Sequence, residues 1–310
     1  MLNRNEFLKS IAVTGAAAMI SAEGASSVMA EAAAGKKGET DLVIAMGGEP
    51  EEMFAASIKK MGGMGRFVKK GQKVFLKPNA AWDRTPEQAA NTNPALVSAV
   101  IKACWDAGAA DVIVSEHTCD EWRRSYQTSG IEAAVLAAGA KMLPANEESY
   151  YREVEIPGAK NLKKAKILNA LLDADCWINI PCLKNHSGAR MTIAMKNLMG
   201  IVWDRRFFHT NNLHQCIADM CLATKPVLNI VDAYRTLKSN GPKGRSDSDA
   251  VVTKAMFMST DMVAVDTAAT RFFNRIVDMP LETVSYLAMG EELGVGTMDL
   301  RSLNIEQVKL

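Results

Sequence analysis

The 310-residue sequence lacks the charge imbalance that would point to a polyanionic partner. Its 36 basic and 35 acidic side chains leave a formal net charge of +1. No global field therefore attracts nucleic acid or an anionic membrane. We predict no nucleic-acid partner, and any attraction for anions must be local.

Cysteine is also sparse, and its spacing excludes two kinds of metal site. The six cysteines, at positions 104, 119, 176, 182, 216 and 221, form no C-x-x-C pair. Neither a zinc ribbon nor a ferredoxin-type iron–sulfur cluster is supported. Most of these cysteines are expected to be small buried hydrophobic residues. Export would permit disulfides, but the sequence does not specify a pairing.

The common nucleotide and nucleophile motifs are absent. No GxGxxG follows the first predicted strand, and the loop "SNGPKGRSDSDA" at 239–250 lacks the P-loop spacing. GxSxG, the serine elbow of hydrolases, does not occur. The 239–250 loop remains a candidate lid or phosphate-binding loop on composition alone.

The first thirty residues are typical of an export signal. They have a basic start, a weakly apolar middle and the small-residue ending "VMA", which suits cleavage after Ala30. The run "RNEFLK" is similar to the twin-arginine signal, with Asn5 in place of the second arginine. We predict export to the periplasm or cell envelope by the twin-arginine or the general machinery. A retained amphipathic anchor is the alternative.

After a linker at 31–40, strand and helix patterns alternate to the end of the chain. Strands are predicted around "DLVIAMG", "QKVFLKPN", "DVIVSEHT", "CWINIP", "PVLNIVDAY" and "AMFMST", with helices between them. This alternation predicts an α/β fold, a mostly parallel sheet flanked by helices in three layers. We predict one domain over 41–310, with a small edge arm around 150–160, and leave open a division into two lobes.

Polar side chains follow the predicted strands at the points where they end. In an open parallel sheet the carboxyl ends of the strands meet at one edge, where ligands bind. The residues at these positions are Lys77 and Asn79, Glu116 and His117, Lys184 to His186, Asp232, and Ser259 to Asp261. The sequence therefore predicts a site at this edge.

The segment 182–200 carries the densest group of these side chains. At about 100° per residue, 189–200 predicts an amphipathic helix. Its apolar stripe would consist of Met191, Ala194, Met195 and Leu198, and its polar face of Arg190, Lys196 and Asn197. A helix start near Ser187 would add free backbone N–H groups for an anion.

Histidines and carboxylates form a second constellation. His186 or His209 with Asp232 could act as an acid–base pair, because imidazole titrates near neutral pH. The set His186, His209, His214 and Asp232 is a candidate site for a transition metal. Asp261 is predicted to cap a helix. Asp266 lies within that helix, where Lys77 or Arg271 would be its partner.

Several blocks together resemble the domain-of-unknown-function family numbered 362. They are "FLKPNAAW", "NTNPALVSAVIKACWDAGAADVIVSE", "LLDADCWINIPCLKNHSGARMTIAMKNLMGIV", "LHQCIADM", "KPVLNIVDA" and "STDMVAVDTAATR". The resemblance runs from about residue 40 to the end and implies one α/β domain, without supplying a reaction. Some relatives carry ferredoxin-like cysteine clusters, which this chain lacks.

We therefore predict an exported enzyme that binds a small anionic organic molecule. The predicted binding residues are Lys77, Asn79, Asn185, Arg190, Lys196 and Asn197, and the predicted catalytic residues are Lys184, His186, His209 and Asp232. Lys184 could instead be a nucleophile, because burial depresses the pKa of an amine. Proton transfer and hydrolysis both remain open. The alternative is a non-catalytic carrier of a metal or redox cofactor.

Overall fold

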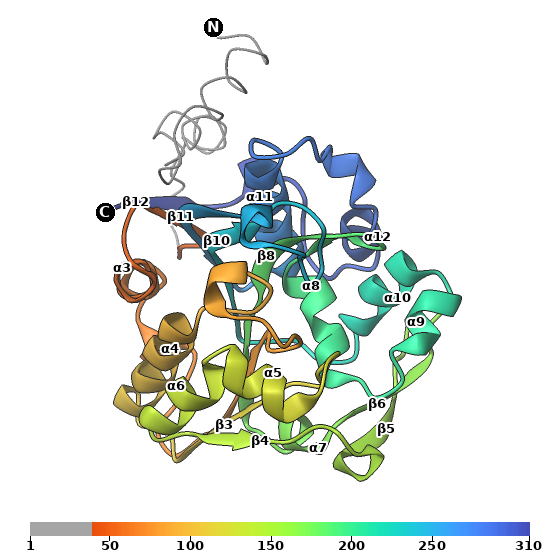
Figure 1. The fold of residues 1–310 in the computed structure, drawn as a ribbon, viewed down its shortest axis with the longest axis horizontal. Coiled ribbons are helices and arrows are strands. Elements are labelled where there is room, and N and C mark those ends of the chain that lie inside the picture. Colours follow the sequence, from red (N-terminus) through yellow and green to blue (C-terminus); the bar gives the residue numbers. More distant parts are fainter. Residues whose placement is uncertain (1–38) are drawn as a thin grey trace, which may run out of the picture.

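A ten-stranded mixed sheet forms the centre of the protein (Figure 1). The computed structural model describes residues 39–310, so the predicted signal and most of the linker lie outside the described residues. The main path of the sheet runs in the order β12, β1, β11, β10, β7, β2, β3, β4, and β8 and β9 continue beside β10. The strands are β1 (Leu42–Met46), β2 (Lys73–Pro78), β3 (Asp111–Ser115), β4 (Lys141–Leu143), β7 (Cys176–Ile180), β8 (Cys182–His186), β9 (Arg190–Thr192), β10 (Leu228–Leu237), β11 (Ala250–Ser259) and β12 (Ile305–Lys309).

Parallel pairing dominates the part of the sheet that leads to the site. β2 pairs in parallel with both β3 and β7, and β7 and β8 pair in parallel with successive parts of β10. β11 is antiparallel to β1 and β10, and β9 is antiparallel to β8. The prediction of a mostly parallel sheet is confirmed.

Helices cover both faces of the sheet, which gives the three predicted layers. One apolar core lies between the sheet and α3 (Pro50–Lys60), α4 (Pro94–Asp106), α5 (Trp122–Thr128) and α6 (Ile131–Ala137). The other lies between the sheet and α7 (Asn169–Leu172), α8 (Ala194–Asn197), α9 (Arg206–Thr210), α10 (Leu213–Met220), α11 (Met262–Phe273) and α12 (Tyr286–Glu292). Along β2, Val74 and Leu76 face the first core and Phe75 the second, the two-residue alternation of a strand covered on both sides.

The local signals for helix starts are confirmed. Pro50 begins α3, and the Asn93 side chain accepts a hydrogen bond from Ala95 N at the start of α4. Asn212 caps α10, and Asp261 caps α11 by accepting from Ala264 N. No helix in residues 39–310 is long and apolar enough to cross a membrane.

The predicted edge arm is a separate two-stranded antiparallel sheet. β5 (Tyr151–Glu155) pairs with β6 (Lys164–Leu168) in a continuous register from Tyr151 opposite Leu168 to Glu155 opposite Lys164. Its buried residues Tyr151, Ala165 and Ile167 belong to the second core, so the arm packs on the α9–α10 side of the sheet.

The prediction of one helix over 189–200 is wrong. This segment forms strand β9, the short helix α8 and the 3-10 helix η4 (Leu198–Ile201). Arg190 has a positive φ of 65°, which a helix does not accommodate. The β9 residues pair with β8, where His186 lies opposite Arg190. The apolar spacing fits both a strand followed by a turn of helix and one longer helix, so periodicity alone did not separate them.

Two predicted strand ends also need correction. β10 continues five residues beyond Asp232, to Leu237, so Asp232 lies within a strand. β11 runs antiparallel to β10, so its carboxyl end points away from the edge to which β2 and β7 lead. Asp261, which follows this end of β11, is the N-cap of α11.

Candidate functional site

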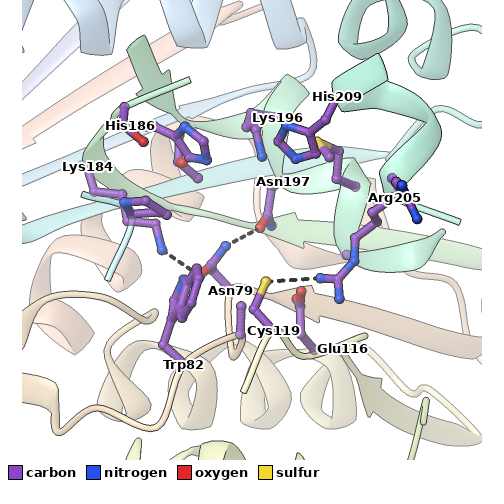
Figure 2. Close-up of a pocket in the computed structure, with 17 residues that line it drawn as sticks. Asn79, Trp82, Glu116, Cys119, Lys184, His186, Lys196, Asn197, Arg205 and His209 are labelled. Atoms are coloured by element: carbon purple, nitrogen blue, oxygen red, sulfur yellow. Dashed lines mark hydrogen bonds between the residues drawn. The ribbon is translucent and has the colours of Figure 1, made fainter. Parts of the chain in front are cut away.

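A pocket of about 370 Å³ opens beyond the carboxyl ends of β2 and β3. Its walls come from the loops after these two strands, from β8 and β9, from α8 and η4, and from the segment around α9. Figure 2 shows His186, Lys196 and His209 along one side and Trp82, Cys119 and Glu116 along the other. The complete lining is Asn79, Ala81, Trp82, Glu116, Cys119, Lys184, His186, Ser187, Thr192, Lys196, Asn197, Met199, Gly200, Arg205, Arg206, His209 and Pro242.

A buried ion pair lies at the bottom of the pocket. Lys77 Nζ is 2.5 Å from Glu116 Oε2, and both side chains are inaccessible to solvent. Burial lowers the pKa of Lys77 and raises the pKa of Glu116, while the attraction between the two groups opposes both shifts. The one carboxylate in the pocket lining therefore already has a cationic partner.

Asn197 links this ion pair to Asn79, Asn179 and Lys184. These side chains, together with Lys77 and Glu116, form the floor of the pocket. Its Oδ1 accepts hydrogen bonds from Lys77 Nζ at 2.7 Å and from Asn79 Nδ2 at 2.9 Å. Its Nδ2 donates to Asn179 Oδ1 at 2.8 Å. Asn79 Oδ1 in turn accepts from Lys184 Nζ at 2.9 Å. Each amide orients the next, so the floor is a fixed polar surface.

Three further cationic side chains line the walls. Arg205 is held in place because its guanidinium donates to the backbone carbonyls of His117 and Thr118 and to Cys119 Sγ, the last at 3.1 Å. Lys196 and Arg206 have no hydrogen-bond or ion-pair partner for their side chains anywhere in residues 39–310. With Lys184, the pocket has four basic side chains facing one neutralised carboxylate, which favours an anionic ligand.

Lys196 differs chemically from an ordinary surface lysine. Burial, together with the neighbouring charges of Lys184 and Arg205, lowers its pKa to about 7. A substantial fraction of the amine is therefore uncharged at neutral pH. An uncharged amine can accept a proton or attack an electrophile.

The two pocket histidines are neutral and have different roles available. His186 Nδ1 accepts hydrogen bonds from Gly188 N at 3.1 Å and Ala189 N at 3.0 Å, which leaves the proton on Nε2. Burial and the charge of Lys196 lower its pKa far below the usual range, so His186 is a hydrogen-bond donor. His209 is exposed at the rim, and burial of part of its ring lowers its pKa.

Thr192 contributes a buried polar group without a protein partner. Its side chain is only 3% exposed, and its Oγ1 makes no hydrogen bond within the described residues. An unsatisfied buried hydroxyl costs about 1–3 kcal/mol. Because Thr192 lines the pocket, a ligand oxygen could supply the missing partner.

Seven of the ten predicted binding and catalytic residues lie at this pocket. Asn79, Lys184, His186, Lys196, Asn197 and His209 line it, and Lys77 lies directly beneath. Lys184, predicted to follow a strand, instead lies within β8.

The other predicted residues serve elsewhere. Asn185 Oδ1 accepts from Gly241 N, and Asp232 accepts from the backbone of Asn93 and Tyr234, which fixes the start of α4. Arg190 is exposed outside the pocket. The metal candidate His214 contacts Gly188 O and Ser285.

The metal-ligand candidates do not converge. In residues 39–310, no three His, Cys, Asp or Glu side chains are placed to hold one metal ion. Asp232 accepts from the backbone of Asn93 and Tyr234, and among the described residues His214 reaches His186 only through Gly188, which contacts both rings.

Asp266 also has partners other than those predicted. It accepts hydrogen bonds from Ala194 N at 2.7 Å and Met195 N at 3.0 Å, so it caps α8.

No helix begins near Ser187, contrary to the prediction. The Ser187 N–H donates to Gly241 O and the Gly188 N–H donates to His186 Nδ1, so neither group is available to a ligand. The predicted anion site at the helix start is therefore wrong.

Several residues that line the pocket were not predicted from the sequence. Trp82, Cys119, Thr192, Arg205 and Arg206 lie in loops, in the short strand β9 or at the start of α9. The adjacent arginines in "WDRRFFHT", just before His209, were the one available signal. Periodicity does not report on such segments.

Among known proteins, this chain is similar to a curated relative and to solved structures that include the following two. A thylakoid-associated protein of Synechocystis sp. is 26% identical over 246 residues, 77% of this chain and 73% of the relative. The lactate racemase apoprotein of Thermoanaerobacterium thermosaccharolyticum superimposes with a TM-score of 0.47 and 12% identity, covering 73% of this chain and 56% of that one. A protein of Thermotoga maritima gives a TM-score of 0.44 and 9% identity, covering 73% and 59%. This chain spans less than two thirds of the length of either solved structure.

The family comparison agrees with the resemblance seen in the sequence blocks. A family model described as "Domain of unknown function (DUF362)" matches residues 74–271, which is more than half of the chain. The chain therefore belongs to the DUF362 family.

Proposed function

We propose that this protein is an exported enzyme that binds a small organic anion in the pocket and moves a proton to or from it. The observation that carries the proposal is the charge of the lining, in which Lys184, Lys196, Arg205 and Arg206 face a single carboxylate already paired with Lys77. A concave site with a few convergent polar groups is the usual form of a small-molecule site.

The size and rigidity of the pocket support a small ligand. A volume of about 370 Å³ is at the lower end of the range for ligand pockets, about 300–1,000 Å³. The Asn79–Asn197 floor and the anchored Arg205 hold their positions through protein contacts alone. A ligand would therefore meet donors already in place, which lowers the cost of binding.

The proton carriers are the groups that face the pocket without partners. Lys196 and His209 are at least partly uncharged at neutral pH, because burial lowers both pKa values. His186 offers a fixed N–H donor to a ligand oxygen. This division into acceptor and donor is what proton transfer next to a carbonyl or carboxylate requires.

Calorimetric titration with a panel of small carboxylates and phosphates tests the binding step. Arg206→Gln should weaken binding of the best anion about tenfold, because it removes one exposed charge-assisted contact. Arg190→Gln is the matched control, since Arg190 is also exposed but lies outside the pocket. Equal losses in both variants, or no binding of any anion, would refute the proposal.

Export is supported by two observations that are independent of the pocket. The first thirty residues have the pattern of a signal with cleavage after Ala30, and the Synechocystis relative is named for its association with thylakoids. Cell fractionation followed by intact-mass measurement tests this. We expect an envelope or periplasmic form that begins at Glu31, and a cytoplasmic form that retains Met1 would contradict it.

A further inference from the structure

We propose that the Lys196 amine forms an imine with the carbonyl carbon of a small 2-oxo acid bound in the pocket. The inference rests on the proposed function and assigns its substrate class. It gives Lys196 a covalent role and leaves proton transfer to the histidine at the rim.

The first argument comes from a comparison of three lysines at one site. Lys77 Nζ contacts Glu116 and Asn197, and Lys184 Nζ donates to Asn79 and to the Ala90 carbonyl. Both amines therefore already have acceptors in the protein. Lys196 has no such acceptor among the described residues, and the charges of Lys184 and Arg205 lie near it.

The second argument is the surroundings of Lys196. Desolvation and a neighbouring cation are the two conditions that make a lysine amine nucleophilic, and Lys196 has both. It projects from α8, whose start is fixed by the bonds of Asp266 to Ala194 N and Met195 N. The amine is therefore placed by a rigid element.

The third argument is that the pocket has groups for both ends of a 2-oxo acid. Arg205 and Arg206 provide guanidinium groups for the carboxylate. Thr192 Oγ1, buried and without a partner, and the His186 Nε2–H are available to the carbonyl oxygen. A simple carboxylate would leave this second set of donors unused.

The step balances without a co-reactant. The amine lone pair forms a bond to the carbonyl carbon, and the carbonyl oxygen accepts both amine hydrogens and leaves as water. A C=N bond replaces the C=O bond, with no oxidation or reduction. The imine nitrogen then takes a proton from solvent water. The resulting iminium withdraws electrons from the adjacent C–H bond, whose proton His209 can accept.

Reductive trapping tests the proposal on the full-length protein. The protein is incubated with pyruvate or glyoxylate and cyanoborohydride, and adducts are located by peptide mass mapping. We expect a single reduced adduct on Lys196, absent in Lys196→Arg and retained in the surface control Lys102→Arg. At pH 7 an amine of pKa 7 is about 1,000-fold more deprotonated than an ordinary lysine, so labelling of surface lysines should be far weaker.

Three results separate the outcomes. Competition by lactate, which has the carboxylate but no carbonyl, should lower the adduct yield. Pyruvate binding without a Lys196 adduct overturns the imine while the proposed function stands, whereas no binding of either acid or of lactate contradicts both. Adducts spread equally over many lysines in wild type and Lys196→Arg also overturn the imine, provided that circular dichroism shows the variant to be folded.

Discussion

Lys77 and Glu116 form an ion pair that is fully enclosed where two neighbouring parallel strands end. The Nζ–Oε2 distance is 2.5 Å, and the exposed fractions of the two side chains are 0% and 2%. β2 and β3 pair in register up to Leu76 opposite Val114, and Lys77, the penultimate residue of β2, lies beside Glu116, the first residue after β3. The pair neutralises the acid of the pocket and leaves the remaining cations free to attract a ligand.

Breaking this pair should strongly destabilise the fold. Glu116→Gln leaves the Lys77 ammonium buried without its counter-charge, and such losses cost about 3–5 kcal/mol. Urea denaturation measures the free energy of unfolding. The control is Glu306→Gln, which removes an exposed partner of Lys60 and should cost less than about 1 kcal/mol. Similar losses of unfolding free energy in the two variants would contradict the prediction that the buried ion pair stabilises the fold more than the exposed one.

Removing the Asn197 amide should affect both stability and binding. Asn197→Ala leaves Lys77, Asn79 and Asn179 each without one hydrogen bond in a buried network, and each unsatisfied group costs about 1–3 kcal/mol. Anion affinity should also fall, since Asn79 and Lys184 lose their orientation. Asn161→Ala, at an exposed amide that bonds one carbonyl, is the control. Unchanged affinity in a folded Asn197→Ala protein would show that the floor does not position the ligand groups.

The sequence placed a residue at the pocket edge of the sheet most reliably where it stands at the end of a buried parallel strand. Lys77, Asn79 and Glu116 follow apolar runs whose neighbours in the sheet are parallel, so their convergence follows from topology. Lys184 and His186 reach the same edge although their segment is a further strand, because β8 continues from β7 after Pro181.

The errors have one physical origin, which is that local pattern does not encode pairing direction. Nothing in "AMFMST" indicates that β11 runs antiparallel, and nothing in "NIVDAY" indicates that β10 continues past Asp232. Similarly, the side chain of Asn197 is buried in the floor, whereas a single longer helix predicted it on a polar face turned away from the core. Long-range contacts decide all three.

Asp266 should make the stability depend on pH between its ordinary pKa and its pKa in the folded protein. Burial raises the pKa of this carboxyl from 3.8 to about 8. In this range the folded state holds a proton that the unfolded state has lost, so the free energy of unfolding falls as pH rises, by at most about 1.4 kcal/mol per pH unit from this group. Chemical denaturation at several pH values measures the slope.

Asp266→Asn should flatten that profile, since the titrating group is gone. The comparison variant is Asp299→Asn: Arg301 lowers the pKa of Asp299, so this group titrates below the window in both states. An unaltered slope in Asp266→Asn, with the slope of Asp299→Asn equal to wild type, would mean that Asp266 stays ionised through its bonds to Ala194 N and Met195 N.

Gly200 should tolerate no side chain, because the floor of the pocket lies directly against it. A Cβ at this position would lie 2.0 Å from Glu116 Oε1 and 2.6 Å from Lys77 Nζ, so the buried ion pair would have to move. We expect Gly200→Ala to lower the free energy of unfolding by about 1–3 kcal/mol and to weaken anion binding, as overpacking does. Gly65→Ala is the matched control, since nothing lies within 4 Å of its added Cβ. If Gly200→Ala binds anions as tightly as Gly65→Ala, the Lys77–Glu116 pair can be displaced without cost and does not shape the pocket.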